Sequence, residues 1–137
     1  QTPLNPGMGE ALVELKKEWR LAIVTSKPEP QALIAIQATG VRHYFDIVVG
    51  PHDDSEIPKA QLLERALREM KELHGELPPL TSCWMIGDRH HDIDAGVEVG
   101  THSAGVLWGF GSREELSSAG ATAIVETPQE LVVVLNN

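Results

Sequence analysis

Apolar and polar positions alternate along the chain in an order that predicts strands followed by helices. Short apolar runs fit strands, and between them apolar residues recur every three or four positions, as on one face of a helix. The strands are predicted at residues 21–24, 45–50, 82–86, 103–107 and 121–125. This alternation is typical of an α/β fold with a mostly parallel sheet. We therefore expect one layered domain over residues 1–137.

The predicted helices have recognisable faces and start signals. The helix at residues 8–17 places Met8, Leu12 and Leu15 on one side, and a long helix beginning at Lys59 has an apolar face. That face consists of Leu62, Leu63, Ala66 and Met70. At three other helix starts, a hydroxyl residue precedes a Glu by three positions, which predicts capping boxes. These pairs are Ser26 with Glu29, Ser112 with Glu115, and Thr127 with Glu130.

Composition and charge exclude several classes of protein. The net charge of −9 disfavours nucleic acid as a partner, because binding a polyanion needs clustered Lys and Arg. No apolar run is long enough to span a membrane. The single cysteine, Cys83, allows no internal disulfide, so we expect a buried thiol and a reducing, cytoplasmic location. The chain starts at Gln1 without a signal sequence or an initiator Met, which suggests that a segment once preceded it.

Polar residues with phosphate or metal chemistry follow several of the predicted strands. Thr25 follows the first strand, the polar loop 52–58 the second, Asp88 the third and the glycine-bearing loop 108–111 the fourth. In parallel sheets, ligands bind beyond the carboxyl ends of the strands. A hydroxyl at Thr25, an ammonium at Lys59 and a carboxylate at Asp88 are parts that phosphoryl transfer uses. We expect these groups to converge on one edge.

Asp88 and Asp92 stand four residues apart at the opening of a predicted helix. Mg²⁺ commonly takes one or two protein carboxylates and leaves its other positions to water and phosphate. Gly87, directly before Asp88, would allow close approach of a ligand to the backbone. We therefore predict that Asp88 and Asp92 bind Mg²⁺.

Each of these residues also has a purely structural interpretation. Thr25 and Ser26 could cap a helix, Lys59 could be a solvated helix lysine, and Asp88 and Asp92 could stabilise a helix start. The order of the set along the chain favours chemistry for Thr25 and Lys59, and Gly87 directly before Asp88 favours the metal there.

Several neighbouring residues are assigned to the surface instead. His90 and His91 lack the spacing of a zinc set, so we expect them to face solvent or to lie just behind the residues that bind a ligand. Asp94 lies inside the predicted helix and not at the end of a strand, so we expect it at the surface. Trp108 and Phe110 could line a substrate entrance or a dimer contact.

The chain resembles the haloacid dehalogenase-like hydrolases, and within them the phosphoglycolate phosphatase type. The resemblance spans nearly the whole chain. It depends on the segments 21–28, 45–50, 59–60, 87–93, 105–112 and 119–131.

The resemblance implies a three-layer Rossmann-like core and hydrolysis of phosphate esters through an aspartyl-phosphate with Mg²⁺. It implies that Thr25, Ser26 and Lys59 bind the phosphoryl group of a small phosphorylated metabolite. Asp88 would hold Mg²⁺, and Asp92 would support the metal or orient Lys59.

Two features of that family are absent from this sequence. The Asp-x-Asp-Gly-Thr motif of its first, central strand is missing, and so is the helical cap domain that follows it. We therefore interpret residues 1–137 as a carboxyl-terminal core fragment and expect it to be inactive by itself.

Two alternatives stay open. One is a non-catalytic phosphate- or partner-binding module, which could form homo-oligomers through exposed strand edges. The other is a phosphoacceptor receiver domain, although there the acceptor Asp precedes the Thr and Lys, whereas Asp88 follows both here.

Overall fold

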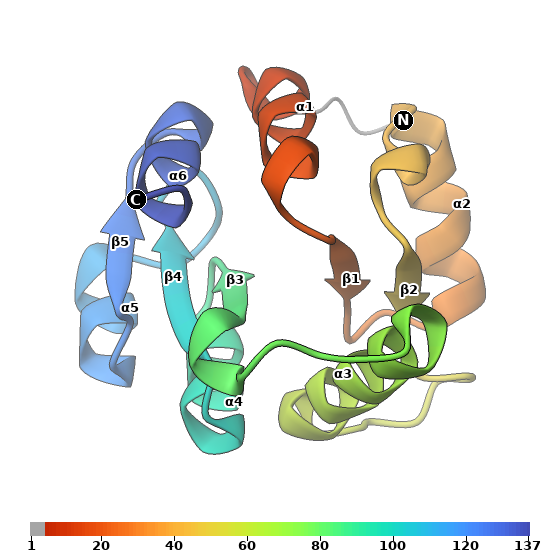
Figure 1. Ribbon diagram of the computed structural model, residues 1–137. Coiled ribbons are helices and arrows are strands. Elements are labelled where there is room, and N and C mark those ends of the chain that lie inside the picture. Colours follow the sequence, from red (N-terminus) through yellow and green to blue (C-terminus); the bar gives the residue numbers. More distant parts are fainter. Residues whose placement is uncertain (1–4) are drawn as a thin grey trace. The chain divides into compact units, whose positions relative to one another are not determined.

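The computed structural model describes residues 5–137, which fall into two compact units that divide between Leu77 and Pro78. Each unit has its own parallel sheet (Figure 1). The sequence prediction of an α/β fold with parallel strands is thus confirmed, whereas the prediction of one domain stays a prediction.

The first unit contains a two-stranded sheet, β1–β2, and its flanking helices. Its elements are α1 (Met8–Glu18), β1 (Ala22–Val24), α2 (Glu29–Thr39), the 3-10 helix η1 (Arg42–Tyr44), β2 (Ile47–Val49) and α3 (Lys59–His74). Ala22 pairs with Ile47 and Val24 with Val49. Because β-branched residues dominate both strands, an extended conformation is favoured there.

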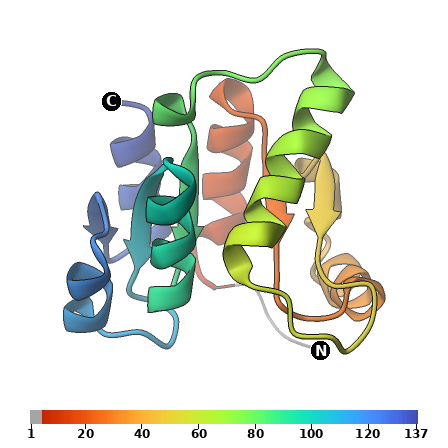
Figure 2. The ribbon, with the colours of Figure 1, turned by 90° about the horizontal axis from the view of Figure 1, so that it is seen from below.

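The core of the first unit forms where α3 packs on the two strands. Val49, Leu62 and Ala66 make a buried cluster, against which Val24, Ile47 and Ile57 pack. All of the predicted core-face residues of α3 are buried, as are Leu12 and Leu15 of α1. Figure 2 shows α3 beside β2. The helical periodicity of the sequence therefore located this core correctly.

The second unit contains a three-stranded sheet in the order β3–β4–β5. Its elements are η2 (Leu80–Ser82), β3 (Trp84–Gly87), α4 (His90–Val99), β4 (His102–Val106), α5 (Arg113–Ala119), β5 (Ala123–Val125) and α6 (Pro128–Leu135). Helix α4 packs on β3 and β4, as Figure 2 shows for β4. Ile93 and Leu116 are completely buried between helices and sheet.

The N-cap half of two predicted capping boxes is confirmed. The Ser112 hydroxyl accepts a hydrogen bond from the amide of Glu115 at 3.0 Å, and Thr127 accepts one from Glu130 at 3.1 Å. The predicted box at Ser26 is wrong, because α2 begins at Glu29 behind Pro28 without a side-chain cap. Tertiary contacts explain the difference, since the Glu29 carboxylate accepts hydrogen bonds from Gly50 and Arg65.

The cysteine differs from its prediction. Cys83 is half-buried and precedes β3, with its Sγ 3.6 Å from the carbonyl oxygen of Pro79. Burial raises the pKa of the Cys83 thiol.

In residues 5–137, no helix has the length and apolar character needed to cross a bilayer.

Candidate functional site

Asp88 follows directly after β3, where the backbone leaves the sheet. Its Oδ2 accepts a hydrogen bond from the amide of Phe110 at 2.9 Å, and its carbonyl oxygen accepts one from the amide of Gly111 at 2.9 Å. The loop after β4 thus contacts the residue after β3. This meeting at one sheet edge was predicted from the order of strands and polar loops.

Two glycines permit this contact. A Cβ on Gly109 would overlap the Asp88 carboxylate, and a Cβ on Gly111 would overlap the Asp88 carbonyl oxygen. A glycine-bearing loop was predicted here, but its role in contacting Asp88 was not. Two glycines spaced by one residue directly after a strand were the available signal, because glycine marks close approach of a backbone to another group.

Asp92 lies in the first turn of α4 and is only 5% exposed. Its Oδ2 accepts a hydrogen bond from the amide of Arg89 at 3.3 Å, so it stabilises the start of the helix. Gly87 leaves room for it, because a Cβ there would overlap the Asp92 carboxylate. The structural interpretation of Asp92 therefore applies.

An ion pair that the sequence analysis missed lies beside these two aspartates. Arg89 Nε donates to Glu115 Oε2 at 2.9 Å, and the amide of His90 donates to the same oxygen at 2.8 Å. The hydrogen bond from Arg89 is the main reason why the pKa of Glu115 is lowered. The same bond is the main reason why the pKa of Arg89 is raised, and Asp88 and Asp92 add to it. Glu115 therefore offsets part of the positive charge that Arg89 brings near the aspartates.

The three residues assigned to the surface are found there. His90, His91 and Asp94 are exposed, and His90 Nδ1 lies 3.2 Å from Asp94 Oδ2. Within residues 5–137, no three His, Cys, Asp or Glu side chains cluster as a metal site would require. A zinc-type set is therefore not found in that range, whereas the pair Asp88 and Asp92 fits the small carboxylate requirement of Mg²⁺.

The phosphate-binding candidates Thr25, Ser26 and Lys59 lie in the first unit. Thr25 follows β1, its amide donates to the Val49 carbonyl oxygen at 2.9 Å, and its Oγ1 accepts from the Lys27 amide at 3.1 Å. This hydroxyl thus orders the turn before α2, but it does not cap the helix, whose N-cap is Pro28 and has no side-chain hydrogen bond. Its own proton is still available to an acceptor. Lys59 is the first residue of α3, as predicted.

Ser26 is exposed and lines a pocket of about 240 Å³. The 52–58 loop forms most of this pocket with Asp53, Asp54, Ser55, Glu56 and Ile57, and Pro28 also lines it. Hydrogen bonds from Ser55 lower the pKa of the Asp53 carboxyl, so it stays charged at neutral pH. These acids repel an anion, and a phosphate beside Ser26 would therefore need a nearby cation.

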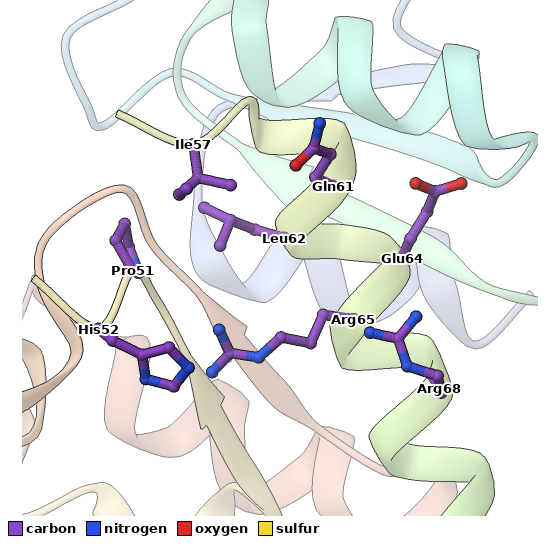
Figure 3. A pocket seen from close by; sticks show the side chains of 8 residues that line it. All are labelled: Pro51, His52, Ile57, Gln61, Leu62, Glu64, Arg65 and Arg68. Carbon is purple, nitrogen blue, oxygen red and sulfur yellow. The ribbon is translucent and has the colours of Figure 1, made fainter. Parts of the chain in front are cut away.

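A second pocket of about 330 Å³ lies between this loop and α3 (Figure 3). Arg65 extends from α3 toward His52, while Pro51, Ile57 and Leu62 supply apolar contacts. Nη1 of Arg65 donates to the Gly50 carbonyl oxygen at 3.0 Å, Nη2 contacts Glu29, and Nε donates to Glu69 at 2.9 Å. All three nitrogens of the Arg65 guanidinium are thus used in contacts within the protein. This structural role was not predicted from the sequence.

The structure therefore joins Asp88 to the 108–111 loop, and it places Ser26 beside the 52–58 loop. The convergence of Thr25 and Lys59 with Asp88 stays a prediction.

Comparison with known proteins identifies relatives over most of the chain. The profile of one family, described as haloacid dehalogenase-like hydrolase, matches residues 1–106. Tyrosine-protein kinase PtkA of Mycobacterium tuberculosis is 31% identical over 88% of this chain and 40% of its own length. Pyrophosphatase PpaX of Bacillus cereus is 31% identical over 93% of this chain and 57% of its own length.

A solved structure shows the same fold. The crystal structure of a provisionally assigned phosphatase from Clostridium difficile superimposes with a TM-score of 0.87 at 30% identity, covering 95% of this chain and 59% of that one. The chain thus spans about half the length of the relatives it matches.

Proposed function

Because the chain belongs to the haloacid dehalogenase-like hydrolase family, we propose that it carries the cation- and phosphate-binding part of a Mg²⁺-dependent phosphate-ester hydrolase. The observation that supports this most directly is the placement of Asp88. Its carboxylate lies at the carboxyl end of β3 and is held by the amide of Phe110. Ligands of α/β proteins bind at such strand ends.

Each candidate residue has a defined task in this proposal. Asp88 and Asp92 hold Mg²⁺, which when bound neutralises charge on the phosphoryl oxygens. Thr25 and Ser26 donate hydrogen bonds to those oxygens, and Lys59 supplies a positive charge. Confining the phosphoryl group in this way contributes to catalysis by positioning and by electrostatic stabilisation.

The nucleophile of an aspartyl-phosphate mechanism is not found among these residues. The first aspartate in the sequence is Asp46, well after Thr25. We propose that the nucleophile lies on a segment outside residues 1–137 and that these residues by themselves do not turn over a phosphate ester.

The proposed substrate is a small phosphorylated metabolite. A phosphoglycolate-type ester is our first choice, and pyrophosphate is the alternative that the name of the Bacillus cereus relative suggests. The proposed location is the cytoplasm.

Metal binding tests the proposal without requiring turnover. Mg²⁺ should raise the melting temperature of the chain, because a ligand that binds only the folded state stabilises it. Asp88→Ala should abolish this shift. Asp94→Ala is the control, since Asp94 is an exposed acid of the following helix, α4, and should leave the shift unchanged. An unchanged Mg²⁺ response in Asp88→Ala would contradict the assignment.

An activity assay tests the proposed absence of the nucleophile. The chain with Mg²⁺ and p-nitrophenyl phosphate should release no phosphate above the background rate. Turnover at a rate typical of phosphatases would show that the nucleophile is among these residues and that the assignment is wrong.

A non-catalytic phosphate- or partner-binding module is the second candidate. It is favoured by strand edges, because in the part of the chain that the structure describes β1 pairs only with β2 and β3 only with β4. Unpaired edges can associate with another strand, including one from a second copy of the chain. Light scattering after size-exclusion chromatography would distinguish a monomer from such a homo-oligomer.

A further inference from the structure

The main chain of the 108–111 loop holds Asp88 at two points. The amide of Phe110 donates to the carboxylate Oδ2, and the next amide, that of Gly111, donates to the carbonyl oxygen of the same residue, both at 2.9 Å. Gly109 and Gly111 approach so closely that a Cβ on either would overlap Asp88. The loop and the aspartate are therefore packed as one piece.

One oxygen of the Asp88 carboxylate is used in this arrangement and the other is not. Within residues 5–137, Oδ2 receives the Phe110 amide, and no hydrogen bond is made to Oδ1. A hydrogen bond from an amide to a carboxylate is charge-assisted and therefore stronger than one between neutral groups. It fixes the rotation of the carboxylate, so that Oδ1 has a defined position.

We infer that the 108–111 loop is a positioning element that makes Asp88 a single-oxygen ligand for Mg²⁺. This inference rests on the proposed function, because it assigns a geometry to the same cation site. Mg²⁺ demands near-ideal octahedral geometry, which suits one oxygen from each carboxylate, whereas Ca²⁺ also accepts both oxygens of one carboxylate. Holding Oδ2 with an amide therefore favours Mg²⁺ over Ca²⁺.

The backbone of Phe110 provides this effect, and its ring does not. The Phe110 side chain is 92% exposed, so its removal disturbs little packing. Its amide, in contrast, is the donor to Asp88. Side-chain and main-chain contributions can therefore be separated at one position, which gives a matched pair of variants.

The test measures Mg²⁺ affinity of the chain by isothermal titration calorimetry. Phe110→Ala keeps the amide and should bind Mg²⁺ as the unchanged chain does. Phe110→Pro removes the amide hydrogen, and Gly109→Ala displaces the carboxylate. Both should weaken Mg²⁺ binding about tenfold or more, as loss of groups that orient metal ligands does. The ratio of Ca²⁺ to Mg²⁺ affinity should rise in Phe110→Pro.

A second measurement tests the same inference if those variants fail to fold. Hydrogen exchange of the Phe110 amide should be slow in the unchanged chain. It should stay slow in Asp88→Asn, whose side-chain oxygen still accepts the bond, and become fast in Asp88→Ala. Asp88→Asn should nevertheless lose Mg²⁺ binding, because the negative charge is gone.

The outcomes separate this inference from the proposed function. If the unchanged chain binds no Mg²⁺, the metal site and this inference fail together. If it binds Mg²⁺ and Phe110→Pro and Gly109→Ala bind equally well, only the inference is overturned. It is also overturned if Phe110→Ala loses affinity, or if Asp88→Ala leaves exchange of the Phe110 amide slow.

Discussion

Arg65 of α3 forms an ion pair with Glu29 in the first turn of α2. The same guanidinium donates to the Gly50 carbonyl oxygen and to Glu69, so one side chain joins two helices to the end of β2. Desolvation lowers the pKa of Arg65, but its bonds to Glu69 and Glu29 outweigh this and raise it. These bonds therefore favour the charged form of Arg65.

Arg65→Met should lower the free energy of unfolding by about 2 kcal/mol, because a carboxylate and a carbonyl oxygen lose their donors. Arg68→Met is the control, since Arg68 is exposed on the same helix and should cost no more than about 0.5 kcal/mol. Urea unfolding measures both. Equal losses in the two variants would show that Arg65 does not join these elements.

Gly50 should not tolerate a side chain. A Cβ at this position would lie 2.6 Å from the Lys27 carbonyl oxygen and 3.1 Å from Thr25 Cγ2. Gly50→Ala should therefore destabilise the chain by about 1–3 kcal/mol, as overpacking does. Gly75→Ala is a useful comparison, because Gly75 has open space around it and a φ of 83°. It should cost only about 1–2 kcal/mol, from the left-handed backbone. Thermal unfolding measures the loss of stability in both variants. A steric effect at Gly50 should also shift the NMR signals of Thr25 in Gly50→Ala, whereas Gly75→Ala should leave those signals unchanged.

The helix cap at Ser112 should contribute measurably to stability. Ser112→Ala removes the acceptor of the Glu115 amide and should cost about 1 kcal/mol. Ser117→Ala, at an exposed position of the same helix, should change stability by less than about 0.5 kcal/mol. A Ser112→Asp variant should restore stability, since Asp also caps helices. Failure of that restoration would contradict a capping role.

Asp46 should make part of the stability pH-dependent. Burial raises the pKa of Asp46, but hydrogen bonds from His74 and Lys16 outweigh it and leave the pKa below its ordinary value of 3.8. A lowered folded pKa means that the charged carboxylate stabilises the fold above pH 3.8 and that this stabilisation is lost as pH falls through the folded value.

Asp46→Asn should therefore reduce the free energy of unfolding most at neutral pH, and the difference from the unchanged chain should shrink below pH 3.8. Urea unfolding at a series of pH values measures this difference. A constant difference across the series would show that the ionised carboxylate is not responsible.

Lys59 should be required for phosphate binding if the proposed function holds. With Mg²⁺ present, Lys59→Met should weaken binding of inorganic phosphate about tenfold, because a positive charge beside the anion is lost. Lys71→Met, an exposed lysine in the last turn of the same helix, should bind phosphate normally. Calorimetric titration with phosphate compares them, and equal affinities would remove Lys59 from the site.

The periodic apolar pattern by itself determined the order of strands and helices and the buried face of α3. It also located the caps at Ser112 and Thr127, because helix faces and N-caps depend on residues a few positions apart. For the same reason, the position of Asp88 after β3 was predictable. These features are local in sequence.

Only the tertiary structure decided which carboxylates have structural partners. Glu29 was expected to cap a helix with Ser26, yet it pairs with Arg65 and Gly50, and Glu115 pairs with Arg89. The attachment of the 108–111 loop to Asp88 likewise depends on backbone atoms that β3 and β4 bring together. Sequence spacing does not specify such contacts, because a long side chain or a backbone amide can choose among several partners, and the packing of distant segments selects one.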